Sequence, residues 1–395
     1  MLQERLIEKR NIAFVHYPHY PEHARVDTMP FVSNTIKKLA DAGWKIDLYL
    51  WENPSIDYSI MFPKNVHLHY QNDKWIPIVD SVLVRISKKK YKENTYRYRF
   101  CSGKKYDCVF GLGQIGAFVA RLISKRNNTP LILFNDEFPS ALPESNWKIH
   151  EKKSAQTARL IVVPDESRIK FLLDDYGLNN HPWAVLPNVS QLKLPDKKID
   201  WHEKLNIPKH LALCLHAGSI GDFAMISELM TSVISWPENT ALVLNDRNKS
   251  NLERMKKIYE PLNRQDRIFW NADSLSDEML NSLVSYCKLN FGLYRNTSPN
   301  IEYIGFSSGK IMRSIAAGVP VIASDLVSLQ FIKEHKLGVL VQNPIEIPDA
   351  ISTILHGNEN YKQNCKVFYE NVCSFDKYWI SFCKKVHSAT GVMID

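Results

Sequence analysis

Short apolar runs alternate along this chain with longer stretches in which apolar residues recur at helical spacing. The apolar runs have the composition of strands that are buried on both faces, and a helical stretch follows most of them. This order is typical of parallel sheets joined by helical crossovers, so the sequence predicts an α/β fold. In the first half the predicted strands are Ile12–Tyr17, Ile46–Trp51, Val66–Tyr70, Asp107–Phe110, Leu131–Phe134, Leu160–Val163 and Ala184–Leu186.

A second series of strands begins at Leu211 and predicts a second sheet. Between the two series, a polar segment marked by prolines has the composition of a linker. We therefore expect two doubly wound domains, residues 1–190 and 211–372, joined by a linker at 191–210 and followed by a helical segment at 373–395. The second series of predicted strands is Leu211–His216, Ala241–Leu244, Arg267–Trp270, Leu289–Leu293, Val319–Ala323 and Gly338–Val341.

Size and composition agree with this organisation. A length of 395 residues suits two domains of roughly 150–200 residues, each large enough for an apolar core. Hydrophobic content of 45% and charged content of 23% are typical of a soluble globular protein, and no apolar run approaches the roughly 20 residues that span a bilayer. The N-terminal residues lack the apolar core of a signal peptide. The scattered cysteines, with no CxxC motif, favour reduced thiols in the cytoplasm over disulfides or zinc.

The segment Phe306–Ala323, with the sequence FSSGKIMRSIAAGVPVIA, carries the strongest functional signal. It predicts a turn of small residues followed by a helix that Lys310 opens. The unpaired backbone N–H groups and the dipole of such a helix start suit a phosphate. The hydroxyl groups of Ser307 and Ser308, close backbone approach at Gly309 and the charge of Lys310 would strengthen that binding. An ordinary capped helix between two strands is the alternative interpretation.

This segment resembles the nucleotide-sugar diphosphate motif of GT-B glycosyltransferases, especially the bacterial family 4-like (group 1) enzymes. The likeness rests on the small-residue turn, the lysine and the ending Ala-x-Gly-x-Pro-Val-Ile, here residues 316–322. The resemblance implies two Rossmann-like domains that face a central cleft, the C-terminal one binding a nucleotide sugar and the N-terminal one an acceptor. It also implies that the last helix, within 373–395, crosses back to the N-terminal domain.

The function that the resemblance implies is transfer of a sugar from a UDP- or GDP-linked donor to a glycan, lipid-linked or other glycoconjugate acceptor, as in polysaccharide biosynthesis. We expect no cofactor and no metal, because a lysine and a helix start would stabilise the leaving diphosphate. By the same resemblance the diphosphate contacts Ser307, Ser308, Gly309, Lys310, Gly218 and Ser219, and the nucleotide or ribose contacts Arg313 and Asn271.

Two adjacent carboxylates, Asp136 and Glu137, follow the predicted strand Leu131–Phe134. An active site opens at the carboxyl ends of strands in this architecture, and a carboxylate there can contact sugar hydroxyls or take the acceptor proton. We therefore expect both residues to belong to the catalytic site. A solvated acidic turn that caps the next helix is the alternative interpretation.

The chain departs from the family pattern beside the phosphate-binding helix. Retaining family 4-like enzymes carry two glutamates around this helix, and Gly305 and Arg313 stand at the matching positions. Glu302, just upstream, is the candidate for the missing catalytic carboxylate, although a surface loop charge is an equally good interpretation. The resemblance favours retention of configuration, and this departure leaves inversion open.

The loop after the first predicted strand is rich in histidine and tyrosine. Because GT-B enzymes shape acceptor sites from loops of the N-terminal domain, His16, Tyr17 and His19 are the candidate acceptor contacts. A metal site is the less favoured alternative, since no cysteine or patterned carboxylate accompanies the histidines.

A basic segment follows the third predicted strand. Between residues 79 and 105, nine Lys or Arg residues and interleaved aromatic residues accompany a single Glu. Such a segment suits an anionic surface, so residues 85–105 are a candidate peripheral contact with the inner face of a membrane or with a lipid-linked acceptor. A solvated face is an alternative interpretation, and a nucleic-acid partner is not expected.

A rival interpretation comes from GLGQIG at residues 111–116, which matches the GxGxxG dinucleotide fingerprint between a predicted strand and a helix. Asp136 lies just after the next predicted strand and 20 residues after Gly116, close to where an NAD-dependent oxidoreductase carries the acidic residue of this fingerprint. The match lies in the middle of the first domain, however, and glycine-rich turns occur in any doubly wound sheet. A non-catalytic GT-B-like binding protein is the third interpretation, because fold does not fix function.

Overall fold

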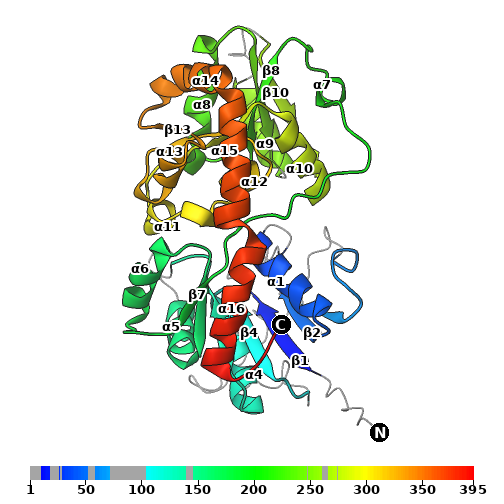
Figure 1. The fold of residues 1–395 in the computed structure, drawn as a ribbon, viewed down its shortest axis with the longest axis vertical. Coiled ribbons are helices and arrows are strands. Elements are labelled where there is room, and N and C mark those ends of the chain that lie inside the picture. The colour runs from blue at the N-terminus through cyan, green and yellow to red at the C-terminus, as the bar shows by residue number, and fades with distance from the viewer. Residues whose placement is uncertain are drawn as a thin grey trace, which may run out of the picture. The chain divides into compact units, whose positions relative to one another are not determined.

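The structure is a computed structural model that describes residues 10–17, 26, 29–51, 58–71, 104–138, 146–246, 248–259, 266–273 and 275–395. The chain divides into two compact units, which are shown in Figure 1. Unit 1 comprises Met1–Leu186 together with Tyr378–Asp395, and unit 2 comprises Pro187–Lys377.

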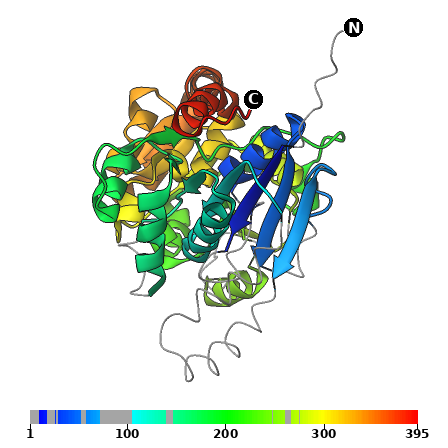
Figure 2. The same cartoon turned by 90° about the horizontal axis from the view of Figure 1, so that it is seen from below.

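The described part of unit 1 contains a seven-stranded parallel sheet with the order β3-β2-β1-β4-β5-β6-β7. Figure 2 shows β1, β2 and β3 side by side in blue. Every residue of β4, β5 and β6 is buried, as expected when helices cover both faces of a sheet. The strands are β1 (Asn11–His16), β2 (Lys45–Trp51), β3 (Val66–Gln71), β4 (Cys108–Leu112), β5 (Leu131–Phe134), β6 (Leu160–Val163) and β7 (Trp183–Val185).

Glycines bring helix α4 close to this sheet. A Cβ atom at Gly116 would lie 2.8 Å from the backbone nitrogen of Tyr17, and one at Gly111 would lie 2.7 Å from the Cβ of Ala120. Gly113 starts the helix with a φ of 75°, which side chains rarely tolerate. Helix–strand packing therefore accounts for the GLGQIG pattern without a bound dinucleotide. The described helices that accompany the sheet are α1 (Pro30–Asp41), α4 (Gln114–Asn127), α5 (Asn146–Thr157) and α6 (Ser167–Tyr176).

The last helix, α16 (Phe375–Thr390), contributes to the core of unit 1 from Tyr378 onward. Phe382 is fully buried, and its ring centroid lies 6.3 Å from that of Phe134 on β5. Lys385 places its ammonium group 4.1 Å from the centre of the Trp183 ring on β7. Residues from the far end of the chain therefore cover the sheet that the first half builds.

The described part of unit 2 contains a six-stranded parallel sheet with the order β10-β9-β8-β11-β12-β13. Its strands are β8 (Ala212–Ala217), β9 (Thr240–Asn245), β10 (Ile268–Asn271), β11 (Leu289–Gly292), β12 (Val321–Ser324) and β13 (Gly338–Val341). The helices used below are α7 (Trp201–Lys204), α8 (Ile226–Ser232), α10 (Asp277–Tyr286), α11 (Pro299–Glu302), α12 (Gly309–Ala316), α13 (Phe331–Glu334), α14 (Ile347–His356) and α15 (Asn358–Phe368). The predicted α/β fold is confirmed in both units.

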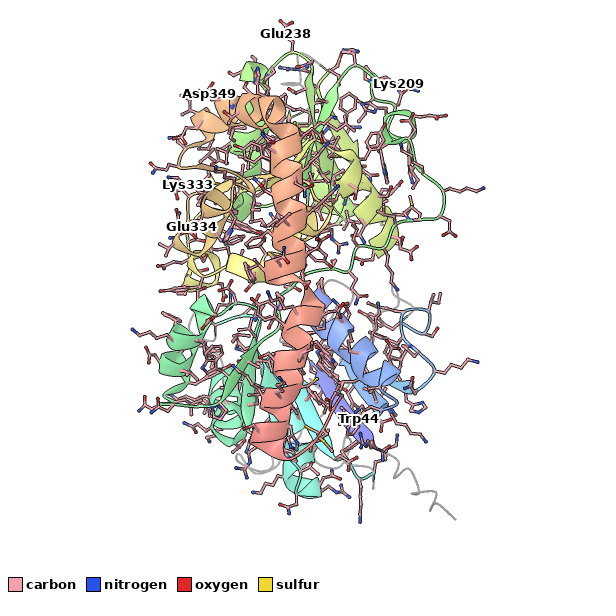
Figure 3. The ribbon with its side chains drawn as sticks, viewed as in Figure 1. Trp44, Lys209, Glu238, Lys333, Glu334 and Asp349 are labelled. Carbon is pink, nitrogen blue, oxygen red and sulfur yellow. The ribbon has the colours of Figure 1, made fainter. Side chains whose placement is uncertain are left out.

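Residues 191–210, which the sequence predicts as a linker, lie within unit 2. Trp201 on α7 is fully buried in a core cluster that also contains Ile207 and Leu211. The carboxylate of Asp200 accepts hydrogen bonds from the backbone N–H groups of the first turn of α7. The connection is therefore an ordered part of unit 2 and contributes to its core. Charged side chains such as Lys209, Glu238 and Asp349 lie at the periphery of the unit (Figure 3).

Candidate functional site

The strand order of unit 2 reverses between β8 and β11, because the chain adds β9 and β10 on one side and β12 and β13 on the other. Ligands of doubly wound sheets bind at the carboxyl ends of the strands where this reversal occurs. The turn after β8 carries Gly218 and Ser219, and the loop after β11 leads to the N-terminus of α12. The residues predicted for a diphosphate therefore meet at the expected position of the sheet.

Lys310, the second residue of α12, directs a buried amine into this site. Its Nζ has no hydrogen-bond partner among the residues that the structure describes. The Nζ lies 4.4 Å from the centre of the Tyr294 ring, a cation–π contact that offers little compensation for lost hydration. Burial lowers the pKa of Lys310 to about 7. An anionic ligand would supply the counter-ion that this buried amine lacks among the described residues.

The N-terminus of α12 is fixed by its own cap. The side chain of Ser308 accepts a hydrogen bond from the backbone N–H of Ile311, at 3.4 Å, and lies 2.6 Å from the Tyr294 hydroxyl. Ser308 is buried, whereas Ser307 and Gly309 are half-buried. Because the cap occupies the Ser308 hydroxyl, the backbone N–H groups and Lys310 remain the main groups for an anion.

The turn after β8 requires a glycine at position 218. Gly218 has a φ of 146°, and a Cβ atom there would lie 3.7 Å from the Cε of Lys310. The next residues are positioned by Asp246 after β9, whose Oδ2 accepts a hydrogen bond from the backbone N–H of Ile220 at 3.1 Å. Ser219 is exposed, so its hydroxyl is accessible to a ligand.

His216, near the end of β8, is fully buried beside Lys310. Burial and the nearby charge of Lys310 lower the pKa of His216 well below its usual value. The imidazole is therefore neutral at physiological pH, and it leaves the positive charge of this site to Lys310.

Asn188, in the segment that leads into unit 2, holds the loop before α12. Its backbone N–H donates to the carbonyl of Phe306 at 3.1 Å, and its Nδ2 donates to the carbonyl of Ser307 at 3.0 Å. A Cβ atom at Gly309 would lie 3.4 Å from the same Nδ2. Asn188 thus fixes the direction of the peptide units whose N–H groups face the candidate anion site.

Arg313, predicted as a nucleotide or ribose contact, is buried and held by α10. Its guanidinium donates to the Oδ1 of Asn281 and forms an ion pair with Asp277 at 2.6 Å. Asn281 in turn donates to the carbonyl of Lys193 at 3.0 Å. Arg313 therefore links α12 to α10 and to the connecting segment, and its contact with a ligand stays a prediction.

Asn271 and Glu302 occupy different parts of the sheet edge. Asn271, the last residue of β10, is buried and donates to the Oδ1 of Asn245 at 2.8 Å. Glu302 ends α11 with a half-buried side chain, and its backbone carbonyl accepts a hydrogen bond from Ser328 at 2.6 Å. Gly305, where family 4-like enzymes carry a glutamate, has a φ of 34°. The ligand contacts of Asn271 and the catalytic role of Glu302 stay predictions.

A pocket of about 360 Å³ lies at the ends of β11, β12 and β13. Tyr294 lines it, so one aromatic ring borders both this pocket and the Lys310 amine. Its other walls include Ser324, Asp325 and Gln342, whose polar groups suit hydroxyl-bearing ligands.

In unit 1, Asn135, Asp136 and Glu137 form the turn after β5. Asn135 is buried, Asp136 is half-buried and Glu137 is exposed. Arg168 on α6 donates to the carbonyl of Asp136 at 2.9 Å, and its guanidinium lies 4.3 Å from the centre of the Phe138 ring. The two predicted carboxylates therefore sit at the carboxyl edge of the sheet on a turn that buried side chains fix. Their catalytic role stays a prediction.

The remaining candidates of unit 1 are the predicted acceptor contacts and the basic segment 85–105. His16 and Tyr17 are buried at the end of β1, with the Tyr17 ring 4.6 Å from that of Trp51. His19 and most of the basic segment 85–105 lie outside the described residues. Lys104, at the end of that segment, forms an ion pair with the buried Asp47 at 2.8 Å.

No group of three or more His, Cys, Asp or Glu side chains among the described residues is arranged to hold a metal ion. No described helix has the length and apolar character needed to cross a membrane.

Sequence reasoning missed three residues that shape the site. Tyr294, Asp246 and Asn188 were not among the candidates, although each directly follows or closely follows a strand. That position, at the carboxyl edge of the sheet, was the available signal for Tyr294 and Asp246. Asn188 contacts a loop 119 residues away in the sequence, and no local pattern indicates this pairing.

No protein-family profile and no curated protein matches the sequence. Solved structures do match it. HepE from Anabaena, in complex with UDP and glucose, has a TM-score of 0.70 at 12% identity over 96% of this chain and 100% of that chain. A glycosyltransferase from Rickettsia africae has a TM-score of 0.67 at 14% identity over 97% and 99%. A Listeria monocytogenes structure described as a UDP-N-acetylglucosamine 2-epimerase has a TM-score of 0.62 at 14% identity over 96% and 96%.

These similarities confirm the predicted fold, with two Rossmann-like units of the GT-B type. At such low identity they establish the architecture alone.

Proposed function

We propose that this protein is a glycosyltransferase that takes a sugar from a nucleoside-diphosphate donor. In this proposal unit 2 binds the donor, with the diphosphate between the turn at Gly218 and Ser219 and the N-terminus of α12. Solved structures of the same fold bind UDP or UDP-glucose, which supports a uridine nucleotide as the first ligand to test.

The observation that carries this proposal is the buried amine of Lys310. Its Nζ has no partner among the described side chains or carbonyls, and it stands beside a helix N-terminus and a glycine turn. A diphosphate supplies the missing negative charge and accepts hydrogen bonds from both backbone segments. When the sugar leaves, the same groups stabilise the charge that develops on the diphosphate, so no metal is required.

Unit 1 supplies the acceptor side in this proposal. Asp136 and Glu137 contact acceptor or donor hydroxyls, His16, Tyr17 and His19 shape the acceptor site, and Glu302 of unit 2 provides a further carboxylate. We propose transfer with retention of configuration to a glycan or lipid-linked acceptor, with residues 85–105 as a peripheral membrane contact. Liposomes of anionic lipid test the last point, and absence of binding at low salt contradicts it.

Binding of UDP-glucose to the Lys310→Met variant tests the donor site. We expect the dissociation constant to rise about 10- to 100-fold, because a charge-assisted hydrogen bond in a desolvated site contributes roughly 1.5–3 kcal/mol. Isothermal titration calorimetry measures the change. Lys333→Met on α13 is the matched control, since Lys333 is an exposed lysine at the periphery of the same unit (Figure 3).

The outcome separates the candidate functions. Unchanged affinity in Lys310→Met would remove the proposed donor site, and NADH binding in place of UDP-glucose would favour the oxidoreductase. Analysis of the products formed from UDP- and GDP-sugars then distinguishes transfer or hydrolysis from epimerisation of the intact nucleotide sugar. Binding without turnover of any of these donors would indicate a non-catalytic GT-B-like protein.

A further inference from the structure

A second buried titratable group lies in unit 1, away from the Lys310 site. Glu151 on α5 is 4% exposed, and its Oε2 has no hydrogen-bond partner among the described residues. Carboxylates are rarely buried without a cation or several donors, because the loss of hydration is costly. The burial of the Glu151 side chain with one oxygen unpartnered in the described part of the chain is therefore unusual.

The Oε1 atom of Glu151 belongs to a compact hydrogen-bond cluster. The hydroxyl of Tyr176 on α6 donates to it at 2.7 Å, and the Nδ2 of Asn135 lies 3.5 Å away. The same Nδ2 donates to the Tyr176 hydroxyl at 3.0 Å and to the backbone carbonyl of Glu137 at 2.7 Å. Glu151 is thus connected, through Tyr176 and Asn135, to the turn at residues 135–137.

The charges around Glu151 oppose its ionisation. Burial raises the pKa of Glu151 to about 8, and the negative charges of Asp136 and Asp175 act in the same direction. Hydrogen bonds from Tyr176 and Asn135 act against this rise without cancelling it.

Positive groups on the neighbouring helices do not offset these charges. Arg168 of α6 interacts with Asp136, Asp165 and Glu137. On α4, Lys125 and Arg126 lie in the last turn, and the guanidinium of Arg121 lies 5.5 Å from the centre of the Phe118 ring. The basic residues of α5 itself are Lys148, His150, Lys152 and Lys153. None of these described groups is a hydrogen-bond partner of the Oε2 of Glu151. At neutral pH the Glu151 side chain is therefore a carboxylic acid, and its Oε1 accepts the hydrogen bond from Tyr176.

We propose that Glu151, while it is neutral and buried, positions the turn at residues 135–137 through Tyr176 and Asn135. Ionising it would release this turn, because the charged carboxylate, whose Oε2 has no donor among the described residues, would have to reach water. Glu151 touches no ligand in this role and is a positioning residue for Asp136 and Glu137. The importance of the turn for catalysis rests on the proposed function. The hydrogen-bond arrangement and its protonation do not.

The charge state is tested by thermal unfolding of wild type and Glu151→Gln at several pH values. A group whose pKa is higher in the folded protein stabilises the fold fully below its unfolded pKa, and this contribution is lost as pH rises toward the folded value. Glutamine does not titrate. Between about pH 5 and pH 8.5 the difference in Tm, variant minus wild type, should therefore increase by several degrees. A difference that stays constant over this range would overturn the proposal.

Hydrogen exchange of the peptide that covers residues 131–138 tests the positioning. After correction for the intrinsic pH dependence, wild type should lose protection in this peptide above about pH 8, whereas Glu151→Gln should keep it. Glu151→Ala should lack this protection at every pH. Tyr176→Phe provides a second disruption if Glu151→Ala does not fold. Equal protection in all variants would overturn the proposal.

Turnover of the nucleotide sugar adds a functional test. Wild-type kcat should fall on the alkaline side with a midpoint near pH 8, and Glu151→Gln should retain neutral-pH turnover without this fall. A shared alkaline fall in both proteins would remove the catalytic part of the proposal. Absence of any turnover would count against the glycosyltransferase function, while the unfolding and exchange experiments would still decide the role of Glu151.

Discussion

Lys310 combines three properties that rarely occur together in one lysine: a buried Nζ, an aromatic ring 4.4 Å from it, and no anionic partner in the part of the chain that the structure describes. A lysine whose purpose was structural would gain stability from a carboxylate, and unit 2 has such pairs elsewhere, for example Lys209 with Asp200. The arrangement at Lys310 costs stability in the empty protein. We interpret this cost as preorganisation for an anion, because the site needs little rearrangement to receive one.

The lowered pKa of Lys310 leads to a prediction about pH. Free Lys310 loses its charge as pH rises through about 7, whereas a bound diphosphate stabilises the charged form, so binding above pH 7 takes up a proton. The affinity for UDP-glucose should fall as pH rises from about 6.5 to 9, approaching tenfold per pH unit. Calorimetry in two buffers with different ionisation enthalpies measures the proton uptake. UDP-glucose suits this test because its phosphates do not titrate near neutral pH.

Lys310→Met is the control for this pH experiment. The variant should bind weakly at every pH and take up no proton on binding. If wild type binds with constant affinity across the range, Lys310 is already charged in the empty protein and this prediction is wrong.

The residues that the sequence identified in this site belong to one continuous motif. Lys310, Ser308 and Gly309 can be identified from the sequence because a helix N-terminus that binds phosphate has a characteristic local sequence of small residues and a lysine. Tyr294 and Asn188 reach the same site from other loops, and their contacts depend on how the sheet is wound. The strand order that brings these loops together cannot be read directly from a single sequence.

At the level of elements, predicted strands match the structure where an apolar run is flanked by turn residues. Leu131–Phe134, Leu160–Val163 and Gly338–Val341 have the predicted bounds. The helical segment after β8 is divided into a 3₁₀ turn (Asp222–Ala224), α8 and a second 3₁₀ turn (Val233–Ser235), because Met225 adopts a φ of 52° between the first two. A positive φ at methionine is imposed by tertiary packing, which local propensity does not contain.

Asn188 supports a prediction at this scale, since it joins the connecting segment to the loop before α12. Asn188→Ala removes the Nδ2 bond to the Ser307 carbonyl, so the backbone N–H groups near Lys310 lose part of their orientation. We expect UDP-glucose to bind about 3- to 10-fold more weakly, the range for one hydrogen bond of roughly 1 kcal/mol. Calorimetry at fixed pH measures it.

Asn360→Ala is the matched control, because Asn360 is exposed on α15. A double-mutant cycle with Lys310→Met should show that the two effects are not additive, as expected for residues that serve one ligand. Full additivity would mean that Asn188 acts on stability rather than on the diphosphate site.

For the whole molecule, the main consequence of the fold is that unit 1 is discontinuous in sequence. Phe382 on α16 is buried against Phe134 on β5, and the two residues are 248 positions apart in the sequence. Phe382→Ala should therefore destabilise unit 1 by about 3–5 kcal/mol, the usual cost of removing a buried phenylalanine ring. Denaturant unfolding followed by fluorescence measures the loss.

Ile380→Ala serves as the control within the same helix, because Ile380 is 62% exposed. We expect this variant to change stability by no more than about 0.5 kcal/mol. Similar effects of the two substitutions would indicate that α16 acts through its helical propensity and not through its packing on β5.

The discontinuity also bears on how the protein is made. A ribosome releases β1 to β7 well before it has synthesised Phe382, so the nascent first half emerges with part of its apolar surface unprotected. Folding of that half must wait until Phe382 has left the ribosome, and in the interval its uncovered strands are exposed to chaperones.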